Sequence, residues 1–428
     1  MNIASNEARC TSCHAGYGWD DKNFDFSRED KVDCLVCHDQ SLEYRKYPSG
    51  AGYPSTEDKD FEGDLYKKPD LNKTAQSVGM PQRHNCGACH FYGGGGDGVK
   101  HGDLDSSLID PPYELDVHMS KDGGNFSCAR CHTTVEHKIA GRCYKTPAFT
   151  DRKSVLDSDM VKRISCVSCH TETPHKENKK LNDHTDKVSC QACHIPAFAR
   201  QNPTKMYWDW STGGKLKDGK PYITMDEEMD RIKYMSKKGD FTWEKNVEPE
   251  YFWFNGSMEY TLLTDKIDPS NPPVKLNRVM GDMNDEKSRI YPFKVHRAKQ
   301  PYDKGNNTMA AVQLHGNNKT SYWKNFQWQN AIQTAMDYME LPYSGKYDFI
   351  ETEYHFPTTH MVAPAKNALN CSSCHSKEGR LKNLAGFYMP GRDSFGFIDK
   401  TGFTLIILSL CTVFVHGLIR IFSSSKKE

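Results

Sequence analysis

One stretch of the chain stands apart in its pattern of apolar and polar positions. Residues 403–422 read FTLIILSLCTVFVHGLIRIF, a run of twenty residues whose ionisable members besides Cys411 are His416 and Arg420. A helix of that length spans the hydrocarbon core of a bilayer. The pattern therefore predicts a transmembrane helix at 403–422 followed by a tail at 423–428, with a buried core helix as the alternative.

Before this run the apolar positions come in short, irregular groups. Residues 325–339, NFQWQNAIQTAMDYM, have apolar groups at helical spacing and predict one of the longer helices. The aromatic groups MYWDWSTGG, EYFWFNG and SYWKNFQWQ lie between residues 195 and 370, and we interpret them as ordinary core packing. Glycine, proline and charged residues are frequent elsewhere, so the pattern favours short helices and irregular loops with little β-structure.

The composition provides few apolar side chains for a core of this size. Hydrophobic residues make up 37% of the 428 residues, so we expect another apolar material to fill part of the interior. The formal net charge is zero, which gives no reason to expect nucleic acid or another polyanion as a partner.

The cysteines identify that material. Fourteen of the sixteen cysteines fall into seven C-x-x-C-H motifs. Two thiols three residues apart can add to the two vinyl groups of one porphyrin, and the next histidine then lies under the iron as its axial ligand. Zinc sites, thioredoxin-like dithiols and disulfides also use cysteine pairs, but none of them requires a histidine after every second cysteine. We predict seven haem c groups, attached at Cys10/Cys13/His14, Cys34/Cys37/His38, Cys86/Cys89/His90, Cys128/Cys131/His132, Cys166/Cys169/His170, Cys190/Cys193/His194 and Cys371/Cys374/His375.

The motif positions suggest how the chain is organised. We expect a haem-rich region at 1–200 with six motifs, then an aromatic-rich helical region at 201–400 that supplies distal histidines and the seventh motif. The helix at 403–422 and the tail at 423–428 complete the chain. The predicted fold class is mainly α with much irregular loop and little β, a multihaem cytochrome c fold wrapped around stacked haems, plus one C-terminal transmembrane helix.

The remaining histidines are candidate sixth ligands. Of 18 histidines, seven lie in motifs and His416 lies in the apolar run, which leaves ten. A haem with two imidazoles carries electrons but offers no open position to a substrate. His84 and His315 lie in polar, glycine-rich sequence and look less suited, and His355 is ambiguous. The best-placed ligands are His118, His137, His175, His184, His296 and His360.

A glycine-rich stretch follows the third motif. Residues 89–103 read CHFYGGGGDGVKHGD, and Gly93, Gly95 and Gly98 formally match G-x-G-x-x-G. A dinucleotide site would need a preceding strand and a following helix, which the pattern lacks. Glycines instead let the backbone pass close to a flat macrocycle and turn sharply, which would deliver Lys100 or His101 to an iron. A solvated Lys100 on a mobile loop is the alternative.

Several motifs together resemble one known family. RCTSCHAGYGW, DCLVCHD, NCGACHFYGGGGDGVKHGDLDSSL, LDVHM, SCQACHIP, KMYWDWSTGG and LPYSGKY are similar to the octahaem tetrathionate reductase family of multihaem cytochromes c, over about residues 5–393. The resemblance implies a periplasmic reductase with one lysine-ligated active-site haem, whose relatives also act on nitrite and hydroxylamine. Carried over, it makes Lys100 the lysine ligand and places catalysis at the haem of Cys10 and Cys13, with His14.

The chain departs from the family in its haem count. The family has eight haems and this chain has seven motifs, so we expect an eighth motif and a signal peptide upstream of Met1. Cys143, outside every motif, is either a buried thiol or the partner of a cysteine in that segment. His416 could ligate a haem of a membrane subunit, face a partner helix, or extend toward the interface.

These features predict a reductase that reduces tetrathionate, nitrite or hydroxylamine, with electrons passed along bis-histidine haems. A non-catalytic conduit and the reverse oxidation of hydroxylamine or hydrazine are the alternatives. Expected partners are a small anionic or nitrogen-oxide substrate, the membrane, and a quinol-oxidising cytochrome b-type subunit; the oligomeric state stays open. Arg420, Lys426 and Lys427 favour a cytoplasmic C-terminus. Haem is attached outside the bacterial cytoplasmic membrane, so the haem region is expected on the periplasmic side of the inner membrane, held by a single span.

Overall fold

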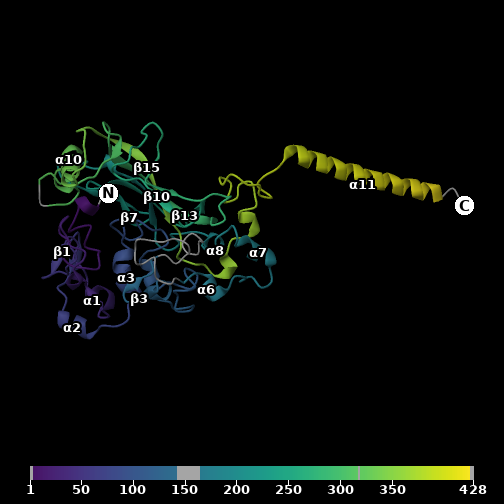
Figure 1. Cartoon of the computed structure of the whole chain (residues 1–428). Helices are drawn as coiled ribbons and strands as arrows, with labels where there is room; N and C mark the ends of the chain where they lie inside the picture. The colour runs from purple at the N-terminus through teal and green to yellow at the C-terminus, as the bar shows by residue number, and fades with distance from the viewer. Residues whose placement is uncertain (1–2, 142–163, 317–318, 425–428) are drawn as a thin grey trace. The chain divides into compact units, whose positions relative to one another are not determined.

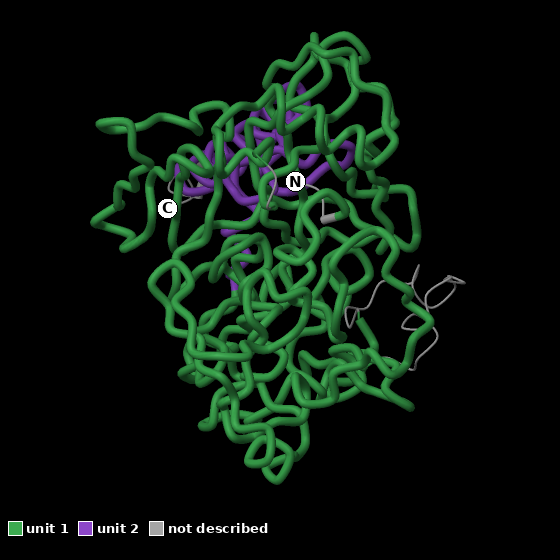
Figure 2. The backbone as a smooth tube through the Cα atoms, turned by 90° about the vertical axis from the view of Figure 1, so that its left-hand side faces the viewer, with its two compact units in different colours: residues 1–368 green, residues 369–428 purple. Residues whose placement is uncertain are grey.

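The computed structural model describes residues 3–141, 164–316 and 319–424 (Figure 1). The chain forms two compact units, residues 1–368 and 369–428 (Figure 2). Cys143 and the last four residues of the tail lie outside the described residues.

The first part of unit 1 is built from short helices and two small hairpins, β1 with β2 and β3 with β4. Most of the described helices here are one or two turns long, and five of them carry a C-x-x-C-H motif or most of one. In chain order the elements are η1 (Ile3–Ser5), η2 (Glu29–Lys31), α1 (Cys34–His38), β1 (Lys59–Phe61), β2 (Asp64–Tyr66), α2 (Leu71–Gln76), α3 (Arg83–His90), η3 (Ser106–Ile109), α4 (Cys128–Cys131), β3 (Thr134–Val135), β4 (Lys138–Ile139), α6 (Val167–His170), α7 (Lys179–His184) and α8 (Cys190–His194).

The rest of unit 1 is dominated by a nine-stranded sheet. Its main order is β11-β15-β13-β5-β8-β7-β6, and β9 and β14 also pair with the long central strand β13. The strand β13 runs parallel to β5 and antiparallel to β15. The elements are β5 (Thr204–Asp209), η5 (Trp210–Thr212), β6 (Ile223–Asp226), β7 (Arg231–Met235), β8 (Gly239–Glu244), β9 (Glu250–Phe254), β10 (Met258–Tyr260), β11 (Val274–Lys275), β12 (Asn277–Val279), β13 (Arg289–Asp303), β14 (Thr308–Met309), α9 (Tyr322–Asn325), α10 (Trp328–Tyr338), β15 (Tyr347–Pro357) and η6 (Ala365–Asn367).

The sheet corrects the predicted fold class. We expected a mainly α chain with little β, and the interval predicted as helical forms this sheet instead. Its sequences, such as GDFTWE in β8 and EYFWF in β9, are rich in aromatic and β-branched residues, which fit a pleated, half-buried surface. Along β8 the even positions are more exposed than the odd ones, the period of two that a strand shows. The predicted division near residue 200 stays a prediction.

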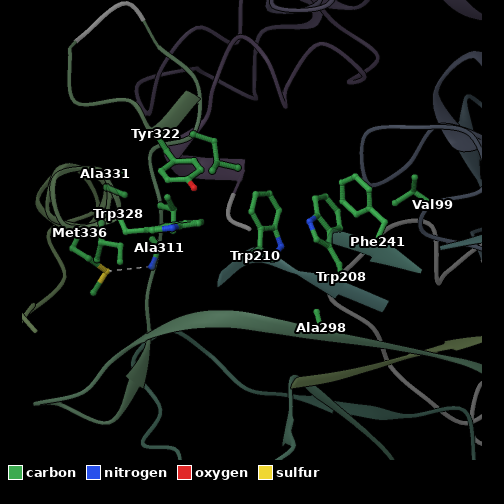
Figure 3. Packing of buried hydrophobic residues seen from close by; sticks show 14 of the residues in the cluster. Val99, Trp208, Trp210, Phe241, Ala298, Ala311, Tyr322, Trp328, Ala331 and Met336 are labelled. Atoms are coloured by element: carbon green, nitrogen blue, oxygen red, sulfur yellow. Dashed lines mark hydrogen bonds between the residues drawn. The ribbon is translucent and has the colours of Figure 1, made fainter. Parts of the chain in front are cut away.

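An aromatic core lies between the sheet and α10 (Figure 3). The helix predicted at 325–339 forms as α10, with Trp328, Ala331, Ile332, Ala335 and Met336 buried on one face. The indole rings of Trp208 and Trp210 stack at 4.4 Å between centroids. Val99, from the glycine-rich stretch, is a member of the same buried cluster, so this stretch is anchored in the core.

Unit 2 contains the seventh motif and a long apolar helix. The motif begins on the short 3-10 helix η7 (Cys371–Ser373), and α11 (Gly396–Ser424) follows. In the described part of the chain, one helix, over Gly396–Phe422, is long and apolar enough to cross a membrane. The predicted span at 403–422 lies within it.

Candidate haem sites and the glycine loop

Backbone carbonyls orient four of the motif histidines for metal binding. In α1 the side chain of Asp33 caps the helix by accepting from the amides of Leu35 and Val36, which starts the turn at the first cysteine. The ring nitrogen Nδ1 of His38 lies 2.9 Å from the Gly79 carbonyl oxygen, and that of His132 lies 2.8 Å from Ala140 O. A carbonyl can only accept, so Nδ1 carries the proton and Nε2 has the lone pair that an iron needs.

The same contact is made in the first and seventh motifs. His14 Nδ1 lies 2.6 Å from Thr11 O, and His375 Nδ1 lies 2.9 Å from Pro390 O. The Nε2 atom of His14 is buried and has no hydrogen-bond partner among the residues that the structure describes. An iron would satisfy this atom, so the donor set fits haem.

The motif thiols lie where a porphyrin edge can reach them. Cys169 lies within α6, Cys193 lies within α8, and Cys374 directly follows η7. The exposed motif cysteines are Cys13, Cys34, Cys169 and Cys371, and the partly exposed ones are Cys10, Cys37, Cys86, Cys89, Cys128, Cys131, Cys166, Cys190, Cys193 and Cys374. None of the fourteen is therefore fully buried. Attachment at each single thiol, and the count of seven haems, stay predictions.

Four histidine pairs in the described part of the chain have the geometry of bis-histidine haem ligation. Each pair joins one motif histidine to one histidine from elsewhere in the chain. Two metal–imidazole bonds of about 2 Å, plus the radii of the two rings, come to about 6 Å between ring centroids. The observed centroid distances are 6.3 Å for His38 and His137, 6.0 Å for His170 and His118, 6.4 Å for His132 and His360, and 6.2 Å for His194 and His175.

The other predicted ligands lie outside these four pairs. His184 and His296 also donate from Nδ1 to backbone carbonyls, of Lys180 at 2.6 Å and Lys205 at 3.0 Å, and neither forms one of these four pairs. His84 uses Nε2 instead, at 3.4 Å from Asp39 O, which does not suit an iron ligand. His101 packs against Phe356 at 5.1 Å, and burial lowers its pKa to about 3.

Contacts between thiols indicate which haem sites are neighbours. Hydrogen-bonding contacts join Cys13 to Cys89, Cys86 to Cys128 and Cys166 to Cys190. Each cysteine would hold the edge of its own porphyrin, so cysteines in contact would bring two haem edges together. The third site therefore has both the first and the fourth as neighbours.

The glycine loop, residues 93–98, needs glycine at particular positions. Gly94, Gly95 and Gly98 have φ values of +80°, +90° and +66°, in the left-handed region that other residues rarely adopt. A Cβ at Gly98 would also lie 3.0 Å from Pro203 O. The loop therefore turns back along α3 and returns Lys100 toward the motif that precedes it.

Two buried side chains of the sheet hold the end of this loop. Thr204 Oγ1 donates to Gly98 O at 2.6 Å, and Lys294 Nζ donates to Val99 O at 2.9 Å. Lys294 Nζ also donates to Thr204 Oγ1 at 2.5 Å. Both residues are about 1% exposed, and they fix the backbone on either side of Val99.

Lys100 lies beside the third motif. Its side chain folds against Gly93, which comes three residues after His90, and its Nζ lies 5.6 Å from the Phe356 ring centroid. Burial lowers the pKa of Lys100, which favours the neutral amine that can bind a metal. Burial also lowers the pKa of His90, and the charge of Lys100 lowers it further, which shows that the two side chains are close.

The first motif has a different setting. The ring of His14 packs against the rings of Trp19 and Phe24, with centroid distances of 5.5 and 5.4 Å. Its charged neighbours are Lys46 and Asp33. The contacts described above place Lys100 near His90, and they do not test the predicted pairing of Lys100 with the haem of His14. The catalytic roles of Lys100 and His14 stay predictions.

Sequence reasoning missed two buried lysines and one buried carboxylate. Lys205 is 4% exposed, and its Nζ lies 3.9 Å from the Trp208 ring centroid and 3.4 Å from that of Phe241. Burial lowers the pKa of Lys294 to about 7, although Asp103 opposes the shift. No signal could have found the lysines, because lysine usually marks an exposed position.

The carboxylate is that of Asp103, just after the glycine loop. Its Oδ2 accepts from the amides of Thr359 and His360, at 2.7 and 2.9 Å, and lies 3.2 Å from His360 Nδ1. Burial alone would lower the pKa of His360, and the hydrogen bond to Asp103 outweighs it and raises that pKa.

Comparisons with known proteins agree with this geometry. A family model described as bacterial cytochrome c matches residues 205–378, and one described as outer membrane cytochrome MtrC/MtrF-like, domains II/IV, matches residues 2–173. An uncharacterised protein of Archaeoglobus fulgidus is 28% identical over 139 residues, which are 30% of this chain and 46% of the relative. The match thus spans less than half the length of that curated relative.

A solved structure is similar over most of the chain. The crystal structure of an octahaem cytochrome c from Shewanella oneidensis is 46% identical, with a TM-score of 0.76, and the match covers 89% of this chain and 80% of that one. Together with the motifs and histidine pairs, this similarity shows the family and the cofactor. The chain belongs to the octahaem cytochrome c family and is a multihaem c-type cytochrome with covalently bound haem c.

Proposed function

We propose that this cytochrome is a reductase that acts at the haem of Cys86 and Cys89, with Lys100 as an iron ligand. Haem c at this site supplies the electrons and the iron to which a substrate binds. The observation that carries the proposal is the position of Lys100 beside His90, with a pKa lowered by burial. This placement favours the third motif over the first as the catalytic haem.

Lysine ligation would make this site chemically distinct from the bis-histidine sites. A buried amine binds a metal only when it is neutral, and it leaves the metal when it takes up a proton. This site can therefore expose a coordination position, whereas an iron held by two imidazoles has both positions filled. The four histidine pairs are suited to electron transfer, and the Lys100 site is suited to binding.

Buried lysines support an anionic substrate. Lys294 contacts the carbonyl next to Lys100, and the charged neighbours that lower the pKa of Lys205, after burial, are Lys238 and Lys294. Burial lowers the pKa values of these lysines, and an anion that enters beside them would favour their charged forms. We propose the anions tetrathionate and nitrite as substrates, with hydroxylamine, which is uncharged, as the alternative that these lysines do not favour. For tetrathionate, two electrons cleave a sulfur–sulfur bond to give two thiosulfates.

Replacement of Lys100 tests the proposal. In haem-loaded protein, Lys100→Ala should change the spectrum of one haem, because one iron loses its lysine ligand. Turnover of the accepted substrate should fall at least tenfold, because that iron is the proposed site of reaction. Lys121→Ala is the matched control, since Lys121 is exposed and pairs with Asp110 at 2.8 Å on the surface. Equal effects of the two substitutions would contradict the proposal.

The second candidate function is an electron conduit between a quinol-oxidising membrane partner and another reductase. The thiol contacts between neighbouring motifs support a conduit as well as they support a reductase, because both functions need closely spaced haems. A conduit would contain low-spin haems whose spectra do not change on addition of nitrite, hydroxylamine or tetrathionate. A spectral change confined to the haem ligated by Lys100 would favour the reductase over the conduit.

We also propose that the cytochrome is anchored by the span within α11, with its haems on the periplasmic side of a bacterial inner membrane. The apolar length of α11 and the basic residues Arg420, Lys426 and Lys427 support this orientation. A quinol-oxidising cytochrome b-type subunit would then supply electrons from the membrane.

A further inference from the structure

We propose that Asp103 lowers the reduction potential of the haem held by His132 and His360, and that this haem is the immediate electron donor to the Lys100 haem. The first part concerns the relay itself and stands whatever the substrate is. The second part rests on the proposed function, because it takes the Lys100 haem as the place where electrons are used.

The first step is the contact between Asp103 and the ligand ring. Asp103 is buried, and its Oδ2 lies 3.2 Å from Nδ1 of His360, the nitrogen that would face away from the iron. The neutral hydroxyl oxygen of Thr359 lies 3.1 Å from the same nitrogen, so Nδ1 has one neutral and one charged contact. In three other ligand rings, one of them the partner ring His132, the Nδ1 contacts that the structure gives are to neutral acceptors: Gly79 O for His38, Ala140 O for His132 and Asn182 Oδ1 for His175. Among these four rings, His360 is the one whose Nδ1 contact is given to a carboxylate.

The second step is the effect of that charge on the iron. A carboxylate that accepts from Nδ1–H draws the proton and gives the imidazole partial imidazolate character, which makes Nε2 a stronger donor. A stronger donor and a nearby negative charge both stabilise ferric iron over ferrous iron. The hydrogen bonds from the Thr359 and His360 amides hold the carboxylate in place, so the effect does not depend on a flexible side chain.

The third step is the location of this haem. Cys128 of the His132 site contacts Cys86 of the His90 site, and the charge of His360 contributes to the lowered pKa of His90. A donor of low potential beside an acceptor makes electron transfer favourable in that direction. One electron leaves the ferrous iron between His132 and His360, which becomes ferric, and enters the ferric iron of the Lys100 haem, which becomes ferrous; no proton is transferred.

The fourth step is the origin of Asp103. It lies three residues after Lys100 in the same segment, so one stretch of chain would supply both the ligand of the catalytic haem and the group that sets the potential of its donor. Their spacing is fixed by the loop that Thr204 and Lys294 hold.

The test compares Asp103→Asn with Asp116→Asn in the full haem-loaded chain. Asparagine keeps the shape and the acceptor oxygen but removes the charge. Asp116 is the matched control because it is equally buried and also clamps ligand turns, accepting from the amides of His118 at 2.8 Å and Met361 at 2.9 Å without a contact to a ring nitrogen. The measurement is a spectroelectrochemical titration, with near-infrared magnetic circular dichroism to follow the ligand type.

We expect Asp103→Asn to raise the midpoint of one bis-histidine haem and to remove one imidazolate-type band, with a smaller change in Asp116→Asn. Equal shifts in both variants would mean that buried charge alone matters and would overturn the proposal. If Asp103→Asn does not accumulate with full haem content, the wild-type spectrum decides, because the proposal requires one imidazolate-type component. Unchanged substrate turnover in Lys100→Ala would overturn the proposed function, whereas an Asp103→Asn shift that is still observed would leave the tuning intact, so the failure of the two proposals can be told apart.

Discussion

At the residue scale, the ring nitrogen that forms the hydrogen bond decides which nitrogen of a histidine is left for a metal. His38, His132 and His175 all have Nδ1 occupied by an oxygen acceptor, whereas His84 has Nε2 at Asp39 O. The carbonyl acceptors fix the tautomer and aim the lone pair at the metal. The sequence alone could not separate all the distal ligands from the other histidines. The hydrogen bond that orients a ring can come from a carbonyl that is distant in sequence, as that of Gly79 is for His38.

Removal of one distal imidazole should affect one haem. In His175→Ala the iron facing His194 loses its sixth ligand, so we expect one ferric haem per chain to become high-spin while the other haems are unchanged. Electron paramagnetic resonance on the oxidised protein measures the number of high-spin irons. His84→Ala is the control, and a high-spin signal of similar size there would refute the assignment of His175.

At the scale of elements, the sheet acts as the support for a loop that belongs to the haem-binding part of unit 1. Strands β5 and β13 run parallel, and Thr204 and Lys294 extend from them to the carbonyls of Gly98 and Val99. Val99 inserts into the aromatic cluster beside Phe241 (Figure 3). The long interval without an attachment site therefore has a structural task, which is to position Lys100.

Loss of the clamp, the hydrogen bonds from Thr204 and Lys294 to the Gly98 and Val99 carbonyls, should lower both the stability of the protein and the ligation of iron by Lys100. In Thr204→Val the buried ammonium of Lys294 and the Gly98 carbonyl each lose a partner, which should lower the free energy of unfolding by about 1–3 kcal/mol. We also expect the spectral signature of Lys100 ligation to weaken, because the loop is no longer fixed. Lys205→Met on the same strand removes an equally buried lysine that does not contact the loop, and a matching loss of Lys100 ligation in that variant would argue against the clamp.

At the scale of the whole molecule, the sequence predicted the cofactor far better than the architecture. Each C-x-x-C-H motif is a local pattern whose spacing indicates covalent haem attachment. Four of the distal histidines chosen from the sequence pair with motif histidines in the structure. The sheet escaped prediction because its central strand, RIYPFKVHRAKQPYD, contains two prolines and buries Lys294, which hides the alternation of a strand. The position of Lys100 near His90 depends on a backbone turn at three glycines with positive φ, which a motif match cannot reveal.

The anchoring role of α11 can be tested by truncation. Removal of residues 403–428 should release the haem-loaded protein from membranes into the soluble fraction, because the apolar span is lost. Haem spectra and turnover with an artificial donor should be retained. Membrane retention of the truncated protein after alkaline washing would mean that another surface holds it.

The most direct test of the account is a crystal structure of the haem-loaded protein at the haem of Cys86 and Cys89. The account predicts that Lys100 Nζ lies at bonding distance from that iron, about 2 Å. Lys100 bound at the haem of Cys10 and Cys13, or directed into solvent with a second imidazole on the Cys86 and Cys89 iron, would contradict it.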